Sequence, residues 1–278
     1  MKDELGDRMK SFYEDRYRVY LTRRTPVIIR IDGNAFHTFT RGLDRPFDHD
    51  LMKIMQKTCL SLCQSIQGCV GGYVQSDEIS LLLVDYQTIE SDAWFDYNLQ
   101  KITSLAAARA TMTFNNLIRQ MVLDAEDDAK TFEKAYEYDV ADEKHALVYK
   151  WYDKQGRAMF DARAFNIPKE EVCNYFIWRQ KDATRNSIQA AGQAQFSNKE
   201  LDRKSQSDIQ EMLFQKGINW NDYTVPEKRG SFVRRFTETT ETENGVITVR
   251  HPWYIDDDMP ILTEDRQYIE ELVYVGEE

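Results

Sequence analysis

Long apolar runs and paired cysteines are both missing from this chain of 278 residues. No apolar run approaches the roughly 18 to 20 residues of a membrane-spanning helix, and the first residues lack the apolar core of a secretory signal. The histidines are scattered without zinc-ligand spacing, and the cysteines form no Cys-x-x-Cys pair. We therefore expect a cytoplasmic protein without a membrane partner, whose thiols are reduced and buried: Cys59, Cys63, Cys69 and Cys173.

Internal repeats and low-complexity tracts are also absent, and the composition is that of an ordinary globular protein. Hydrophobic residues make up 42% and charged residues 30% of the chain, which argues against wholesale disorder. The net charge of −11 disfavours a surface coated with nucleic acid, because phosphate affinity comes from Lys and Arg. The charge is uneven, however. Residues 124–143 are strongly acidic, whereas residues 179–204 and 228–235 gather cations where a polyanion could dock.

The order of apolar segments predicts an α+β fold with a split βαβ plan, βαββαβ. Its antiparallel sheet would carry helices on one face. Consecutive β-branched residues favour a buried first strand, and an alanine-rich stretch without proline or glycine favours a long second helix. The expected elements, in the order strand, helix, strand, strand, helix and strand, are residues 26–32, 48–67, 69–74, 79–84, 98–121 and 145–151.

Beyond this core, the chain predicts a helical extension and a β-hairpin. Pro168 and the acids after it suit the start of a helix that runs to about residue 196. Residues 201–215 continue the helical pattern, and Asn244-Gly245 between apolar runs is a strong hairpin signal. We expect a catalytic core over residues 1–165 and a helical, RNA-contacting region over residues 166–278. The acidic segment 124–143 would be a flexible connection or an insertion.

Two aspartates lie where this topology brings the end of the first strand and the central hairpin turn together. Asp32 closes the first apolar run and precedes Gly33, and Asp77 lies in the turn of the central hairpin. The tip of the first strand and this turn meet at one end of a βαββαβ sheet. Mg²⁺ usually takes one or two carboxylates plus substrate phosphates, and two such ions clamp the attacking and leaving oxygens of a phosphoryl displacement. The pair therefore predicts a nucleotidyl-transfer site.

Other residue types near these acids leave alternatives open. Glu78 either takes part in catalysis or faces away from Asp77, since neighbours on a strand alternate sides. The loop from Gly33 to His37 can approach a triphosphate, because glycine permits close backbone contact. Lys101 is either a phosphate ligand or an ordinary solvent-exposed lysine. The basic helix near residues 179–186 is either a solvated face or an RNA contact.

Five ordered segments resemble motifs of the tRNA-His guanylyltransferase family, the 3′–5′ RNA polymerases. The likeness spans about residues 17–232 in the family's order, which makes chance a poor explanation. One difference falls at residues 184–187, Thr-Arg-Asn-Ser, where the eukaryotic branch carries His-Ile-Asn-Asn. This resembles the Thg1-like branch, whose members mainly repair truncated tRNA 5′ ends. The matching segments are residues 29–39, 73–80, 160–163, 178–186 and 218–231.

The resemblance implies a polymerase-like palm, usually in a homotetramer, that binds tRNA and nucleoside triphosphates and uses two Mg²⁺ ions. ATP or GTP would activate a 5′-monophosphorylated tRNA end, and the 3′-hydroxyl of an incoming nucleotide would then attack that phosphate. Arg45-Pro46 replaces the family's Lys-Pro and keeps a charge that can meet phosphate. We expect template-dependent 3′–5′ addition to the tRNA 5′ end.

Residue types and resemblance together give the expected site. Its catalytic residues are Asp32, Asp77 and Glu78. Its metal ligands are Asp32, the Gly33 carbonyl and Asp77. Nucleotide is expected to contact Gly33, Asn34, Ala35, Phe36, His37, Arg45, Asp48, Ser76 and Lys101. RNA is expected to contact Arg179, Lys181, Arg185, Asn186, Lys228 and Arg229.

Three alternative functions remain open from sequence. A tRNA-His guanylyltransferase would add only the −1 G. A nucleotide cyclase would share the two strand-end acids but would need no RNA, and the motifs beyond residue 160 disfavour it. A catalytically inert RNA-binding module would not need the acids, and all three are present.

Overall fold

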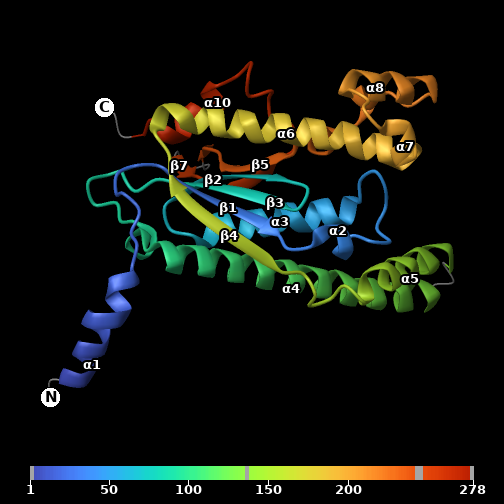
Figure 1. Cartoon of the computed structure of the whole chain (residues 1–278). Helices are drawn as coiled ribbons and strands as arrows, with labels where there is room; N and C mark the ends of the chain where they lie inside the picture. Colours follow the sequence, from blue (N-terminus) through green and yellow to red (C-terminus); the bar gives the residue numbers. More distant parts are fainter. Residues whose placement is uncertain (1–2, 135–137, 242–246, 276–278) are drawn as a thin grey trace.

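A computed structural model describes residues 3–134, 138–241 and 247–275, and it is organised around one six-stranded sheet (Figure 1). Every neighbouring pair of strands in it runs antiparallel, in the order β4-β1-β3-β2-β5-β8. The first four strands in this order form the predicted βαββαβ unit, and two later strands extend the same sheet. The strands are β1 (Val27–Gly33), β2 (Cys69–Gln75), β3 (Glu78–Leu83), β4 (Phe160–Asn166), β5 (Ser231–Arg235) and β8 (Trp253–Asp256).

The two helices of the βαββαβ unit cover one face of the sheet, as predicted. They are α3 (His49–Ser65) and α4 (Leu99–Lys134), and α5 (Tyr138–Tyr152) packs on the second of them. Residues of α4 recur at helical spacing to bury one stripe against the sheet: Ile102, Ala106, Ala110, Phe114, Ile118 and Val122. Alternate residues of β1 meet this layer: Val27, Ile29 and Ile31.

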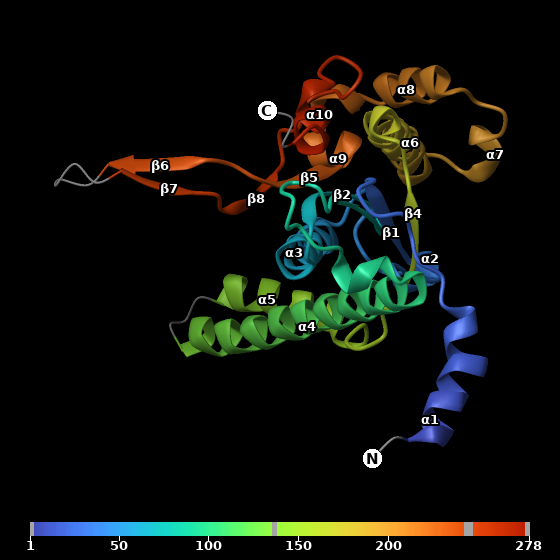
Figure 2. The ribbon, with the colours of Figure 1, turned by 90° about the vertical axis from the view of Figure 1, so that its left-hand side faces the viewer.

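The C-terminal extension covers the opposite face (Figure 2). Its long helix α6 (Lys169–Gln195) and α10 (Gln267–Val273) pack on Ile28, Tyr73 and Leu82, which point away from α3 and α4. A third apolar cluster joins α6 to the shorter elements near its end: α7 (Asn198–Leu201), α8 (Gln206–Gln215) and the 3₁₀ turn η4 (Trp220–Asp222). Helix α9 (Val225–Arg229) also contacts α6. The helices expected from residue 168 to 215 are therefore present, with a break between residues 201 and 206.

Two segments extend from this body. The N-terminal turns α1 (Glu4–Met9), η1 (Lys10–Glu14) and η2 (Asp15–Tyr17) bury no residue, and α1 points away from the sheet (Figure 1). The strands β6 (Glu238–Glu241) and β7 (Ile247–Arg250) pair antiparallel as the predicted hairpin (Figure 2). Its expected turn, Asn244-Gly245, lies outside the described residues.

Two sequence expectations are wrong. Residues 145–151 lie in helix α5, and the closing strand of the unit is β4, Phe160–Asn166. The short apolar run at 145–151 fits a buried helix face as well as a strand, and periodicity alone does not separate the two. The acidic segment is also no flexible connection over its described part, because α4 continues to Lys134 and α5 begins at Tyr138, with α4 and α5 in contact.

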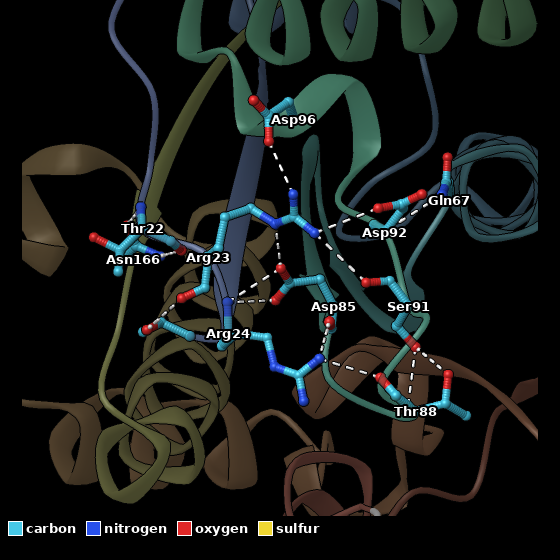
Figure 3. A network of polar contacts seen from close by, with 11 residues as sticks. Thr22, Arg23, Arg24, Gln67, Asp85, Thr88, Ser91, Asp92, Asp96 and Asn166 are labelled. Carbon is cyan, nitrogen blue, oxygen red and sulfur yellow. Dashed lines mark hydrogen bonds and ion pairs between the residues drawn. The ribbon is translucent and has the colours of Figure 1, made fainter.

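At the end of the sheet where β1 begins, a polar network ties the incoming chain to the strand β3 (Figure 3). Asp85 is fully buried and accepts hydrogen bonds from Arg23 Nε at 2.7 Å and from the backbone N–H of Arg24 at 2.9 Å. Arg23 also reaches Asp96 at 2.9 Å, and Asn166 exchanges two hydrogen bonds with the backbone of Thr22. The Asp85 carboxylate and the Arg23 guanidinium therefore balance each other inside the protein.

The remaining composition-based expectations can be compared directly. All four cysteines are buried and free, which confirms their assignment as reduced core thiols. Over residues 3–134, 138–241 and 247–275, none of the helices combines the length and apolarity needed to cross a bilayer.

Candidate active site

The tip of β1 and the β2–β3 turn are joined by the backbone. The Gly33 amide donates to the Asp77 carbonyl at 3.1 Å, and Asp32 lies directly opposite Glu78 in the β1–β3 register. Ser76, the first residue of the two-residue turn, takes a left-handed φ of 50°. The predicted acids therefore lie together at one edge of the sheet, for the topological reason that the sequence suggested.

Gly33 is required here by packing. A Cβ on residue 33 would lie 2.3 Å from the ring of Phe36, which no side chain tolerates. Phe36 is buried and stacks against Phe114 and Phe160 with ring centroids 5.6 and 5.1 Å away. Phe36, which we expected from sequence to contact nucleotide, is instead part of the hydrophobic core in this structure.

The electrostatics of the two aspartates are those of an incompletely neutralised pair. Burial raises the pKa of the Asp77 carboxyl, and the negative charge of Asp32 adds to the rise. Asp32 is about one-third exposed, and its carboxylate has only distant cationic neighbours, Arg30 at 3.7 Å and Arg163 at 3.9 Å. A cation placed between the two carboxylates would relieve this repulsion.

Glu78 has a different environment, because two arginines already neutralise it. Its carboxylate lies 2.5 Å from Arg30 Nη2 and 2.7 Å from Arg179 Nε as ion pairs, and it accepts a hydrogen bond from Arg179 Nη2 at 2.8 Å. Burial raises the pKa of Glu78, and the charges of Arg179 and Arg30 oppose that rise. Glu78 is therefore held in place beside Asp32 with its charge balanced.

Arg179 is correspondingly not an exposed RNA ligand in this structure. It is 3% exposed, and the same Nη2 that donates to Glu78 also donates to the Asp182 carboxylate at 3.0 Å. Its guanidinium also lies over the ring of Trp178, 4.5 Å from the centroid. We reinterpret Arg179 as the residue that positions Glu78, contrary to the sequence expectation.

A small pocket of about 160 Å³ adjoins the hairpin turn. Three of the expected site residues line it from three elements: Asp48 from the start of α3, Ser76 from the turn and Asn186 from α6. Asp48 is the least available of them, since it accepts hydrogen bonds from Leu51 N at 3.0 Å and from Lys150 Nζ at 2.6 Å. These bonds hold the pKa of Asp48 below its ordinary value even though burial opposes them, so this carboxylate caps α3.

A larger cleft of about 660 Å³ lies between α6, α8, η4 and α9. Four of the expected RNA contacts line it: Lys181, Arg185, Lys228 and Arg229. Trp178 and Trp220 contribute aromatic faces, and the cleft has no acidic lining residue. We call it the tryptophan cleft.

The remaining expected nucleotide contacts are divided between two places. Asn34 and Ala35 follow the tip of β1 and His37 lies on the short helix α2 (Phe36–Phe39), all three exposed, and Arg45 is exposed on the loop before α3. Lys101 is not brought to this edge. It begins α4 at the opposite end of the sheet, where its amine lies 4.4 Å from the ring centre of Phe95. Within one chain, Lys101 therefore does not face the two aspartates.

The donor set fits Mg²⁺ rather than a softer metal. Two carboxylates and a backbone carbonyl at Gly33 match the few protein ligands that Mg²⁺ takes when phosphates complete its shell. Over the described parts of the chain, no cluster of three or more His, Cys, Asp or Glu side chains is arranged to hold a metal by itself. The site is therefore suited to an ion that arrives with a nucleotide.

Sequence reasoning missed two features of the site. Arg30 contacts Glu78 and lies near Asp32, and its signal was a charged residue inside an otherwise apolar strand. The two tryptophans of the cleft belonged to recognised motifs, but only their spatial meeting reveals a shared cavity.

Comparison with known proteins decides the family. Residues 6–168 match the family model Thg1, described as tRNAHis guanylyltransferase. The chain belongs to the tRNA-His guanylyltransferase family. It is therefore a nucleotidyltransferase with the palm-like α+β fold expected from its sequence.

Among solved structures, a bacterial Thg1-like protein in complex with ATP is 40% identical, with a TM-score of 0.79 over 98% of this chain and 100% of that one. A structure of a bacterial Thg1-like protein in complex with GTP is 38% identical, with a TM-score of 0.75 over the same shares. A probable tRNA(His) guanylyltransferase of Dictyostelium discoideum is 25% identical over 79% of each chain. These likenesses confirm the resemblance to the Thg1-like branch. The homotetramer and the cytoplasmic location stay predictions.

Proposed function

We propose that this chain repairs 5′-truncated tRNA by template-dependent addition of nucleotides in the 3′–5′ direction. A 5′-phosphate oxygen of the RNA first attacks the α-phosphorus of ATP or GTP and releases pyrophosphate. The 3′-hydroxyl of an incoming nucleoside triphosphate then attacks the activated 5′-phosphate and releases the nucleoside monophosphate. The observation that carries the proposal is the meeting of Asp32 and Asp77 at the edge of the sheet, linked by the bond from Gly33 N to Asp77 O.

In this proposal Asp32, Asp77 and the Gly33 carbonyl hold two Mg²⁺ ions. Bound Mg²⁺ would lower the pKa of an attacking hydroxyl and neutralise charge on the phosphates. The protein itself supplies position and charge rather than covalent chemistry. Glu78, fixed by Arg30 and Arg179, keeps a third carboxylate next to Asp32 in one orientation.

The pocket beside the hairpin turn is the place for the nucleotide in this account. Ser76 and Asn186 offer polar groups to it, and the exposed residues Asn34, Ala35 and His37 follow the tip of β1 at the same end of the sheet. Arg45, exposed on the loop that precedes the pocket residue Pro46, supplies positive charge for a triphosphate.

Repair, rather than addition of a single −1 G, is supported by residues 184–187. Thr-Arg-Asn-Ser stands there in place of the His-Ile-Asn-Asn of the eukaryotic branch, and the solved relatives of 38% and 40% identity are bacterial Thg1-like proteins. Base pairing with the opposite strand of the acceptor stem would then select the nucleotide, so few side chains need to read the base.

The decisive experiment offers a 5′-truncated tRNA, ATP, Mg²⁺ and all four nucleoside triphosphates, and sequences the repaired 5′ end. Repair predicts restoration of the missing templated nucleotides on several tRNAs. Full-length tRNA-His lacking its −1 G is the matched second substrate. Addition of G to that RNA alone would replace the repair proposal by guanylyltransfer, and cyclic nucleotide formed without RNA would replace both.

A further inference from the structure

The tryptophan cleft combines the two features by which proteins hold unpaired nucleotides. Such sites pair a basic groove for the phosphates with aromatic faces on which bases stack. Here Trp178 is half exposed and lines the cleft, with the Arg179 guanidinium 4.5 Å from its ring centroid. Lys181, one turn further along α6, makes no ion pair or hydrogen bond with the described residues. Its full charge is therefore available to a phosphate.

Trp220 is fixed on the other side of the cleft. Its indole N–H donates to the Ser187 hydroxyl at 3.0 Å, which sets the orientation of the ring. The amine of Lys228 lies 5.9 Å from the centre of that ring and donates to the Asn221 carbonyl at 2.6 Å. Because the Trp220 ring and the Lys228 ammonium are already held in place, binding a ligand between them loses little side-chain entropy.

The cleft is also a neighbour of the proposed nucleotide pocket. Helix α6 lines both cavities: Thr184 and Arg185 line the cleft, whereas Asn186 and Ser187 line the pocket. Helix α9 also lines both. Its residues Lys228 and Arg229 line the cleft, and Glu227, together with Gly230 just after the helix, lines the pocket. The two cavities lie on either side of the contact between α6 and α9.

We propose that the tryptophan cleft binds an unpaired nucleotide of the RNA end, with its base on Trp178 and its phosphate at Lys181. This inference rests on the proposed function, because an RNA end at the neighbouring pocket is what brings an unpaired nucleotide within reach. The cleft volume of about 660 Å³ lies within the range of small-molecule pockets. The cleft has four cationic lining residues and no acidic one in a chain whose net charge is −11.

The test measures binding alone, by fluorescence anisotropy of 3′-labelled RNA hairpins without ATP or Mg²⁺. One hairpin is blunt, and the other carries two unpaired nucleotides at its end. The wild-type protein is expected to prefer the second hairpin about tenfold, as stacking of one base provides. Trp178→Ala should abolish this preference and leave the affinity for the blunt hairpin unchanged.

Lys181→Ala gives an independent arm that does not depend on packing. It should weaken binding of the unpaired hairpin about three- to tenfold and reduce the slope of log affinity against log salt by about 1. Lys10→Ala, on the projecting N-terminal segment, is the matched control and should change neither value. Thermal unfolding verifies that each variant is folded.

Equal losses for both hairpins in Trp178→Ala and Lys181→Ala, or no loss in either, would overturn the inference. An ATP titration of the same variants forms the last arm. If they weaken ATP binding while the preference for unpaired RNA survives, the cleft holds a free nucleotide and the RNA assignment fails. Because no arm requires turnover, inactivity in the repair assay would leave this result readable.

Discussion

At the end of the sheet where β1 begins, the carboxylate of Asp85 is fully buried and is met by Arg23 and by the backbone N–H of Arg24. At the other end, burial and the charge of Asp32 raise the pKa of Asp77, and no arginine contacts its carboxylate within the described residues. The first carboxylate is neutralised by its own chain, and the second is left for a ligand. Balanced charge marks a structural role, and unbalanced charge marks a candidate functional site.

The largest expected effect is the loss of nucleotide addition when Asp32 or Asp77 is replaced. Asp32→Ala and Asp77→Ala should each lower nucleotide addition by about 10³-fold or more, because each removes a ligand whose electrostatic role carries the rate. Single-turnover assays with activated RNA measure the loss, and thermal unfolding should show no drop in midpoint. Asp7→Asn, an exposed acid on the projecting N-terminal segment, is the control and should retain activity. Near-normal turnover in both alanine variants would refute the assignment.

Arg179 provides the next largest effect, on stability. Arg179→Met should destabilise the protein by about 3–4 kcal/mol, because it removes the main partner of the buried Glu78 carboxylate. Urea unfolding measures this loss. Arg185→Met, on an exposed turn of the same helix, should stay within about 0.5 kcal/mol of wild type.

The double variant Glu78→Gln with Arg179→Met sharpens the interpretation. Its loss of stability should be smaller than the sum of the two single losses, because the residues share one interaction. Additive losses of stability would contradict the pairing of Arg179 with Glu78. An Arg179→Met protein that is stable but binds RNA poorly would likewise show that Arg179 contacts RNA.

Asp85 tests the structural end of the comparison. Asp85→Ala should cost about 2–3 kcal/mol, because the Arg24 N–H loses its buried acceptor and Arg23 loses its closest partner. Nucleotide addition per folded molecule should remain normal below the unfolding transition. A selective loss of activity without loss of stability would show that the two ends are not different in kind.

The smallest expected effect concerns pH. The pKa of Asp77 is raised in the folded protein, so the folded state keeps this proton to a higher pH than the unfolded state. Stability therefore falls as pH rises through the window between the ordinary aspartate value and the raised one, and the penalty is fully present above the raised pKa. Asp77→Asn should accordingly raise the melting temperature of the metal-free protein by a few degrees at pH 7.

The gain from Asp77→Asn should vanish below the ordinary aspartate pKa, where both states are protonated. Asp32→Asn should lower the pKa of Asp77, measured from its carboxyl carbon by NMR, because it removes one cause of the rise. An unchanged pKa in that variant would mean that the two carboxylates do not interact.

Much of the fold followed from sequence because its signals are local. The apolar run before Asp32, the hairpin around Asp77 and the uninterrupted helix after residue 98 each specify an element, and βαββαβ topology then brings the acids together. The closing strand did not follow, since Phe160–Asn166 alternates between buried and exposed residues while residues 145–151 look more apolar. Its place in the sheet is set by pairing with β1.

The site was predictable to the extent that chain topology determines it. Asp32, Gly33 and Asp77 meet because strands end there. Arg179, in contrast, was expected to contact RNA but pairs with the carboxylate of Glu78, which is 101 residues away in sequence. Lys101 has the side chain of a typical phosphate ligand, but it lies in the first turn of α4 at the opposite end of the sheet. Ion pairs between residues far apart in the sequence cannot be predicted from the local sequence pattern.

The most direct measurement of the central claim is the anomalous diffraction of a crystal soaked in Mn²⁺ together with a non-hydrolysable ATP analogue. Our account predicts two anomalous peaks at the edge of the sheet, each within coordinating distance of a carboxylate of Asp32 or Asp77 and of a phosphate oxygen. A bound nucleotide with no peak between these two aspartates, or with the metal ions held elsewhere in the chain, would contradict it.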